Sequence, residues 1–263
     1  MKIRYYEDKV HVFLFEKKIG EIIKHDPYDP YDLSFEYVKE YQGIPISFSM
    51  PVSDYPYSAK KTYSFFQNLL PEGALLTYLS KQRKFSSDDL FKALMVLGKE
   101  TAGALVITKD EQVPENDCQY VDYTEQIIDF IKERNGYLIL KTNAKLSLAG
   151  EQDKLAVYLK DDHFYLPKNY APTSHILKPD SLIYPGLVYN ESFCLTLAEE
   201  LHLNVIEHKI YNFSDCRPIL CLKRYDRVGS VRLHQEDFCQ ALGIFRAAKY
   251  QSPESKIGRR SIV

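Results

Sequence analysis

Residues 149–154 form a short loop whose composition suits phosphate binding. The segment Ala149-Gly150-Glu151-Gln152-Asp153-Lys154 leads directly into the alternating segment 155–159. Because Ala149 and Gly150 carry little side chain, backbone N–H groups of such a loop can turn toward phosphate oxygens. The loop has one glycine where the glycine-rich loop of kinases has three, so an ordinary hairpin turn is the commoner interpretation of it in isolation.

A lysine and a glutamate follow the loop at a spacing that phosphoryl-transfer enzymes use. The run His175-Ile176-Leu177-Lys178 predicts a strand that ends in a lysine. In kinases a strand lysine neutralises nucleotide phosphates and is positioned by a glutamate from a helix. We expect such a helix, with Asn190 as its N-cap and Glu191 in its first turn. Taken singly, Lys178 also fits a surface lysine and Glu191 a first-turn acid favoured by the helix dipole.

A second hairpin then precedes a charged segment. Residues 205–213 and 218–225 predict two strands, and the second strand ends in Lys223-Arg224-Tyr225. A kinase lobe places its hinge backbone against adenine at this point. The order of loop, strand lysine, helix glutamate, hairpin and hinge is that of a kinase amino-terminal lobe, and this order is more informative than any one motif.

The elements that must position these residues divide the chain into four parts. Residues 1–110 are β-rich, with a hairpin at 10–22, strands at 34–38 and 46–50, and then helical patterns before a strand at 101–107. Residues 111–136 form a connecting segment with a helix, residues 137–250 the nucleotide lobe, and residues 251–263 a tail that matches no expected pattern. The predicted fold class is α+β, with a β-rich amino-terminal subdomain packed on a kinase-like lobe that has an antiparallel sheet.

Composition argues against several classes of function. The 263 residues carry a formal net charge of -2, so we do not expect autonomous binding to nucleic acid. Five scattered cysteines include no CxxC pair, and we expect no zinc site. The amino terminus lacks a signal-peptide core and no apolar run reaches the length of a membrane span. These features predict a reduced, cytoplasmic protein without a membrane partner.

Over nearly its whole length the chain resembles the HipA-type serine/threonine kinases, the toxins of bacterial toxin–antitoxin modules. Several ordered segments carry the resemblance, and together they are specific. They are residues 65–73 (FFQNLLPEG), 97–104 (LGKETAGA), 147–154 (SLAGEQDK), 173–178 (TSHILK), Asn190-Glu191, 224–227 (RYDR) and 234–243 (HQEDFCQALG).

The resemblance implies roles for individual residues. Ala149 to Lys154 would form the ATP-phosphate loop, Lys178 would contact the phosphates, and Lys223, Arg224 and Tyr225 would form the adenine hinge. Ser147 would be the loop serine that the family autophosphorylates, and a dianion at that place would repel the nucleotide. The implied cofactors are ATP and Mg²⁺. The implied partners are a HipB-like antitoxin, DNA only through that antitoxin, and glutamyl-tRNA synthetase as a substrate.

The sequence departs from the family after residue 251. Family members continue into a helical lobe with the catalytic aspartate and the Mg²⁺ ligands, and no residue here is assigned to catalysis or to a metal. We therefore expect the chain to be inactive alone, as the product of a frameshifted or prematurely stopped gene. Three hypotheses remain: a kinase, a catalytically dead binding module for an antitoxin or nucleotide, and one half of a split kinase. We also expect an exposed apolar face after Tyr211, with poor solubility or association with a partner.

Overall fold

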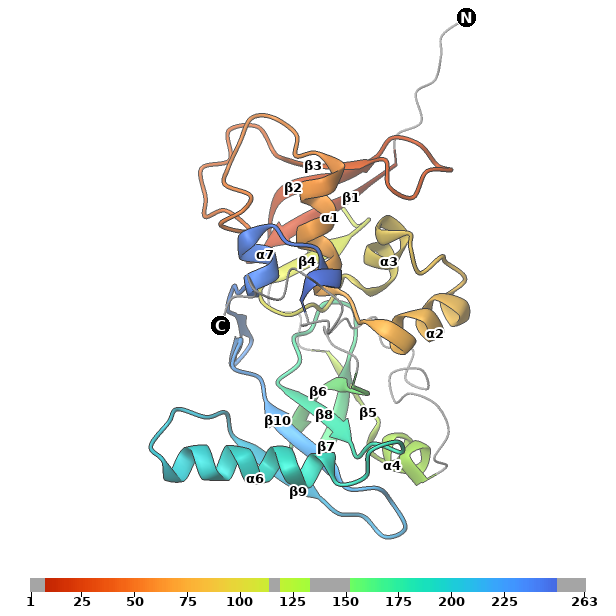
Figure 1. Cartoon of the computed structure of the whole chain (residues 1–263), viewed down its shortest axis with the longest axis vertical. Helices are drawn as coiled ribbons and strands as arrows, with labels where there is room; N and C mark the ends of the chain where they lie inside the picture. The colour runs from red at the N-terminus through yellow and green to blue at the C-terminus, as the bar shows by residue number, and fades with distance from the viewer. Residues whose placement is uncertain (1–7, 114–118, 133–151, 250–263) are drawn as a thin grey trace, which may run out of the picture.

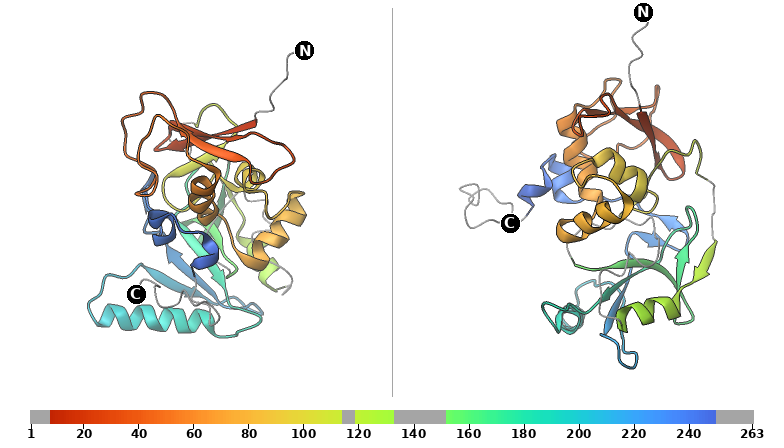
Figure 2. Two further views of the ribbon diagram at one scale, coloured as in Figure 1. Left: turned by 45° about the horizontal axis from the view of Figure 1, so that its top comes forward. Right: turned by 90° about the vertical axis from the view of Figure 1, so that its right-hand side faces the viewer.

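In the computed structural model, which describes residues 8–113, 119–132 and 152–249, two antiparallel sheets lie one above the other with three helices between them (Figure 1). The helices between the sheets are α1 (Ala59–Phe66), α2 (Gly73–Arg83) and α3 (Leu90–Leu97). Figure 2 shows the same arrangement from two other sides. The mixed helices and antiparallel sheets confirm the predicted α+β class.

The first sheet has the strand order β3-β2-β1-β4. Its strands are β1 (Asp8–Leu14), β2 (Lys17–Lys24), β3 (Leu33–Tyr37) and β4 (Leu105–Thr108). The turn between β1 and β2 uses Phe15 and Glu16 at positive φ, which suits the twist of a tight hairpin. Val10, Val12 and Ile22 are completely buried against the helices.

The strand predicted at residues 46–50 is wrong. The segment makes a single bridge, between Ser47 and Met50. The hydroxyl of Tyr37 accepts from the Ile46 N–H at 3.0 Å and donates to the Met50 carbonyl at 2.7 Å. Because a buried side chain satisfies these backbone groups, the segment remains a loop despite its alternating sequence.

The second sheet has the strand order β5-β7-β6-β8-β10-β9. Its strands are β5 (Tyr120–Asp122), β6 (Leu155–Lys160), β7 (His163–Pro167), β8 (His175–Pro179), β9 (His208–Tyr211) and β10 (Ile219–Lys223). One face packs on α4 (Thr124–Lys132) and the other on α6 (Leu187–Glu200). This follows from alternation along β10, where Ile219 and Cys221 join the cluster of α4 while Leu220 and Leu222 join that of α6.

After β10 the chain returns to the amino-terminal half. A short hairpin of β11 (Arg227–Val228) and β12 (Val231–Arg232) leads to α7 (Phe238–Leu242), followed by the 3-10 turn η2 (Arg246–Ala248); another 3-10 turn, η1 (Gln67–Leu69), follows α1. Asp237 and Gln240 form a capping box at the start of α7. The Gln240 carbonyl accepts from Ser49 Oγ at 2.6 Å, and the Gln240 Nε2 donates to the Phe65 carbonyl of α1 at 3.3 Å, which holds α7 beside α1.

A buried ionic cluster joins the two halves of the molecule. Glu100, which precedes β4, accepts from Arg224 and Arg227, each at 2.9 Å, and also from Arg232. Asp226 accepts from Arg224 at 2.6 Å and from the Gly103 N–H at 2.7 Å. Burial opposes ionisation of Glu100, but the three guanidinium groups outweigh it and hold the pKa of this carboxyl below its usual range.

Replacing Glu100 by glutamine should destabilise the protein strongly. The change keeps the shape of the side chain but leaves three buried arginines facing one carboxylate instead of two. We expect the free energy of unfolding to fall by about 3–5 kcal/mol, measured by urea denaturation. The matched control is Glu207→Gln, which breaks an exposed pair with Lys223 and should leave stability nearly unchanged. Equal effects of the two substitutions would contradict a joining role for the cluster.

Candidate nucleotide site

Lys178 and Glu191 form the ion pair that the sequence predicted. Lys178 lies on β8, and its Nζ donates to Glu191 Oε1 of α6 at 2.7 Å. Both side chains are partly buried, at 18% and 32% exposure, so a ligand can reach them without unfolding the site. A strand lysine held by a helix glutamate is the arrangement that kinases use at nucleotide phosphates.

The start of α6 differs from the prediction. Asn190 is not the N-cap, because the helix begins at Leu187 with Gly186, at φ 95°, before it. The carboxylate of Asp180 accepts from the Gly186 N–H at 2.7 Å and the Val188 N–H at 3.2 Å. This carboxylate satisfies two N–H groups at the helix start. Because the helix begins at Leu187, Glu191 lies in its second turn, beside the sheet.

Lys154 lies near the Lys178–Glu191 pair at the end of the predicted phosphate loop. Burial and the neighbouring Lys178 charge lower the pKa of Lys154 to about 8. Glu72, Glu191 and Lys249 also act on it electrostatically. Glu72 precedes α2, is buried, and accepts from Lys249 Nζ at 2.9 Å. Sequence reasoning missed Glu72 and Lys249, although Glu72 belongs to one of the segments that carry the family resemblance.

Part of the predicted loop falls outside the described residues. Ser147, Ala149, Gly150 and Glu151 lie there, while Gln152 and Asp153 are described. The Nε2 of Gln152 is buried and has no hydrogen-bond partner among the described residues. An unpaired buried N–H donor is costly unless a ligand supplies an acceptor.

These residues suit a polyphosphate better than a metal ion. Three lysines and the unpaired amide of Gln152 offer donors to phosphate oxygens. The residues present therefore fit the phosphates of ATP. The described residues contain no group of three or more acidic, histidine or cysteine side chains that could hold a metal by themselves. At nucleotide sites Mg²⁺ is usually held by one or two carboxylates together with the phosphates and water.

The predicted hinge is engaged in other contacts. The N–H of Lys223 donates to the Glu207 carbonyl and that of Arg224 to the Ser174 carbonyl, each at 2.9 Å. The Arg224 side chain belongs to the buried ionic cluster, whereas Tyr225 is exposed. The N–H groups of Lys223 and Arg224 are therefore already paired, and the Arg224 guanidinium has a structural role.

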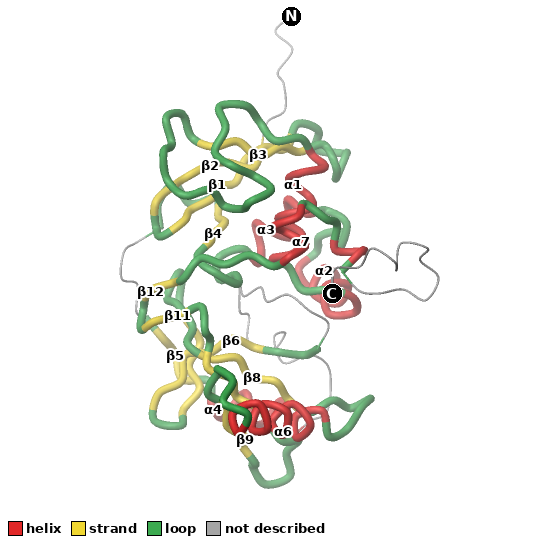
Figure 3. The backbone as a smooth tube through the Cα atoms, turned by 60° about the vertical axis from the view of Figure 1, so that its left-hand side comes forward, coloured by secondary structure: helices red, strands yellow, loops and turns green. Residues whose placement is uncertain are grey.

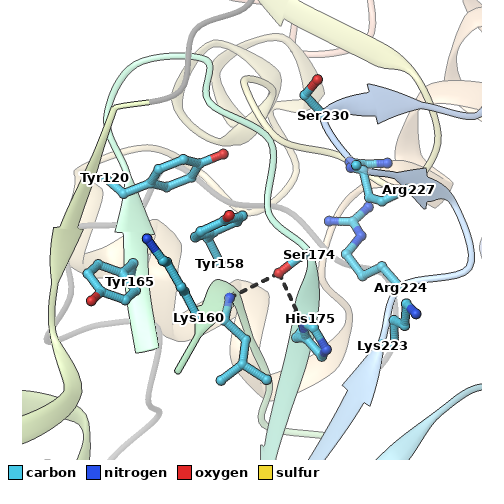
Figure 4. A pocket seen from close by; sticks show the side chains of 12 residues that line it. Tyr120, Tyr158, Lys160, Tyr165, Ser174, His175, Lys223, Arg224, Arg227 and Ser230 are labelled. Carbon is cyan, nitrogen blue, oxygen red and sulfur yellow. Dashed lines mark hydrogen bonds between the residues drawn. The ribbon is translucent and has the colours of Figure 1, made fainter. Parts of the chain in front are cut away.

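A cavity of about 650 Å³ lies at the end of the second sheet, and sequence reasoning did not anticipate it (Figure 4). Lys223 and Arg224 contribute to its wall, but Lys154, Lys178 and Glu191 do not. It is bordered by Gly229 and Ser230 of the β11–β12 hairpin, which lies on the opposite side of the molecule from α2 (Figure 3). The cavity therefore does not include the Lys178–Glu191 pair, but it shares Lys223 and Arg224 with the predicted adenine hinge.

The fold and the Lys178–Glu191 pair define a kinase-type lobe joined to a β-rich subdomain. The family model for the HipA N-terminal domain matches residues 10–108, and that for the HipA-like C-terminal domain matches residues 146–261. The chain belongs to the HipA family.

Individual relatives agree with this assignment. The chain is 34% identical to the protein Y4mE of Sinorhizobium fredii, over 84% of this chain and 56% of the relative. It is 29% identical to the serine/threonine-protein kinase toxin HipA of Shewanella oneidensis, over 92% of this chain and 57% of the relative. The solved complex of Shewanella oneidensis HipA, HipB and operator DNA matches with a TM-score of 0.73 at 29% identity, again over 92% and 57% of the two chains. The chain thus spans a little over half the length of these relatives.

The acidity of Lys154 provides a test of the site's electrostatics. The rate at which acetic anhydride acylates the Lys154 amine can be measured by mass spectrometry at a series of pH values. We expect this rate to reach half of its maximum near pH 8. Lys178→Met should raise that midpoint, because it removes a neighbouring positive charge and leaves Glu191 without its partner. The control is Lys209→Met, on the exposed β9. A midpoint near the ordinary lysine value in the unsubstituted protein would contradict the described site.

Proposed function

We propose that this chain holds ATP as part of a HipA-type serine/threonine protein kinase, the toxin of a toxin–antitoxin system. The observation that carries the proposal is the 2.7 Å contact between Lys178 and Glu191, with Lys154 beside it. Lys178 contacts the phosphates, and Glu191 holds its ammonium group in place. Gln152 to Lys154 close the phosphate end of the site.

The same hypothesis assigns a regulatory serine, a substrate and an antitoxin partner. Ser147 is the autophosphorylated serine, and a glutamyl-tRNA synthetase is the substrate of the kinase in the cytoplasm. A HipB-like antitoxin is the partner, which agrees with the presence of HipB in the solved complex of the Shewanella relative. The described residues supply binding groups, and phosphoryl transfer additionally needs a carboxylate base and metal ligands.

ATP binding measured by calorimetry, with and without Mg²⁺, tests the proposal. We expect the unsubstituted chain to bind ATP and Lys178→Ala to weaken binding about tenfold or more, because charge-assisted hydrogen bonds to phosphate are lost. Lys209→Ala, a lysine on the far strand β9, should bind like the unsubstituted chain. Absence of binding, or equal loss in both variants, would refute a nucleotide site at Lys178. ATP turnover measured on the same samples separates holding the nucleotide from transferring its phosphate.

An exposed apolar stripe favours a second candidate function, a module that binds another polypeptide without catalysis. Four side chains spaced four residues apart face solvent along α6 and its end: Tyr189, Phe193, Leu197 and Leu201. Further large apolar side chains are exposed after Tyr211, as predicted, and include Tyr225, Val228, Val231, Leu233, Phe238 and Leu242. Apolar surface of this kind marks interaction sites.

The stripe makes a separate prediction about association. In sedimentation velocity at micromolar concentration, we expect the unsubstituted chain to self-associate or to retain a bound protein. The double variant Phe193→Glu with Leu197→Glu should abolish this association, because it places charge in the stripe. The control pair, Glu199→Lys and Glu200→Lys, changes charge on the same helix outside the stripe. A monodisperse, soluble unsubstituted chain would argue against this second function and leave the nucleotide hypothesis intact.

A further inference from the structure

The cavity at the end of the second sheet has a wall formed mostly by residues outside the predicted nucleotide site. Its side chains come from the ends of several strands and from the β11–β12 hairpin (Figure 4). At about 650 Å³ it falls within the range of sites that enclose small organic ligands. Two properties of the wall, its aromatic rings and its charge, indicate what such a ligand would be.

Three tyrosines form the aromatic side. Tyr120 and Tyr158 stack with ring centroids 4.2 Å apart at 18°, and Tyr165 meets Tyr158 edge-on at 6.4 Å. The Tyr120 hydroxyl donates to the Pro172 carbonyl at 2.9 Å, which holds this ring in place. Held rings present flat apolar faces to a planar ligand at little cost in side-chain entropy.

The charge of the wall is positive. The twelve lining residues include Lys160, Lys223, Arg224 and Arg227, as well as His175, but no aspartate or glutamate. Lys223 is paired with Glu207 outside the wall, whereas Lys160 makes no ion pair with any other residue in the described part of the chain. An anion in the cavity would therefore meet an uncompensated ammonium group.

The buried ionic cluster adds to this field from behind the wall. Its three arginines face two carboxylates, which leaves one net positive charge among the described side chains. Arg227 belongs both to the cluster and to the wall, and its buried Nε has no hydrogen-bond partner among the described residues. The low dielectric around these groups leaves their field less screened than that of surface charges.

We propose that this cavity is a second ligand site, which binds a small aromatic anion such as an aryl phosphate. The ring packs against Tyr158 and its tyrosine neighbours, and the anionic group lies toward Lys160, which Figure 4 shows on the tyrosine side of the cavity, across from Arg227. Lys154, Lys178 and Glu191 do not line the cavity, so its ligand does not occupy the proposed phosphate site, although the cavity shares Lys223 and Arg224 with the predicted adenine hinge. The site therefore stands whether or not the chain proves to be a kinase.

The test uses 4-methylumbelliferyl phosphate as a fluorescent probe, titrated with the full chain. We expect saturable binding that weakens as salt is added and is unaffected by excess ATP. Tyr158→Ala should weaken binding about tenfold by removing the stacking face, and Lys160→Gln should weaken it several-fold. The matched controls are Tyr184→Ala and Lys209→Gln, an exposed tyrosine and an exposed lysine away from the cavity. They should leave binding unchanged.

Three outcomes would overturn the proposal. No saturable binding, or equal loss in Tyr184→Ala, would mean that the cavity holds no such ligand. Displacement of the probe by ATP together with loss of binding in Lys178→Ala would make the cavity part of the nucleotide site. Equal affinity for uncharged 4-methylumbelliferone would contradict an anion site. Tyr158→Phe, which keeps the ring, should bind normally, and thermal unfolding of each variant shows whether a loss reflects misfolding.

Discussion

The buried carboxylate of Glu100 is the constraint on which the rest of this structure depends. Three arginines from the segment after β10 converge on it, and Asp226 neutralises part of their charge. Removing so many charges from water is costly, and only hydrogen bonds of good geometry repay that cost. The arrangement therefore favours the relative position of the two halves in which all three guanidinium groups reach their carboxylates.

The cluster also determines where the candidate nucleotide groups lie. Thr173, two residues before β8, donates its Oγ1 to Glu100 at 2.7 Å, and Arg224 immediately follows β10. The cluster thus anchors one end of both strands, and β8 carries Lys178 away from this anchor toward α6. The same anchoring sets the amino-terminal half above the second sheet, where Glu72 and Lys249 come near Lys154. Structural charge and ligand-facing charge are adjacent but use different residues.

The two candidate sites differ in whether acidic side chains balance their positive charge. At Lys178 the lysines lie beside glutamates. Burial and the Lys178 charge lower the pKa of Lys154 to about 8, so the protonation of Lys154 can change when phosphates bind. At the tyrosine-lined cavity the twelve described lining residues include no acid, and part of the positive charge comes from arginines of the buried ionic cluster. The same arginines thus hold the fold together and contribute positive charge to the candidate ligand site.

The sequence by itself determined the features that depend on local pattern and order. The hairpin of β1 and β2, the strand ending near Lys178 and a following helix that supplies Glu191 could all be predicted, because alternation and spacing act within a few residues. Only the tertiary structure decided the start of α6, since Asp180 caps it from outside the helix, and the loop at 46–50, since Tyr37 satisfies its backbone. The same holds for Arg224, whose position suggested a hinge but whose side chain is drawn into the cluster by Glu100, 124 residues earlier in the chain. Contacts between distant segments decide burial, and burial decides whether a charged side chain serves the fold or a ligand.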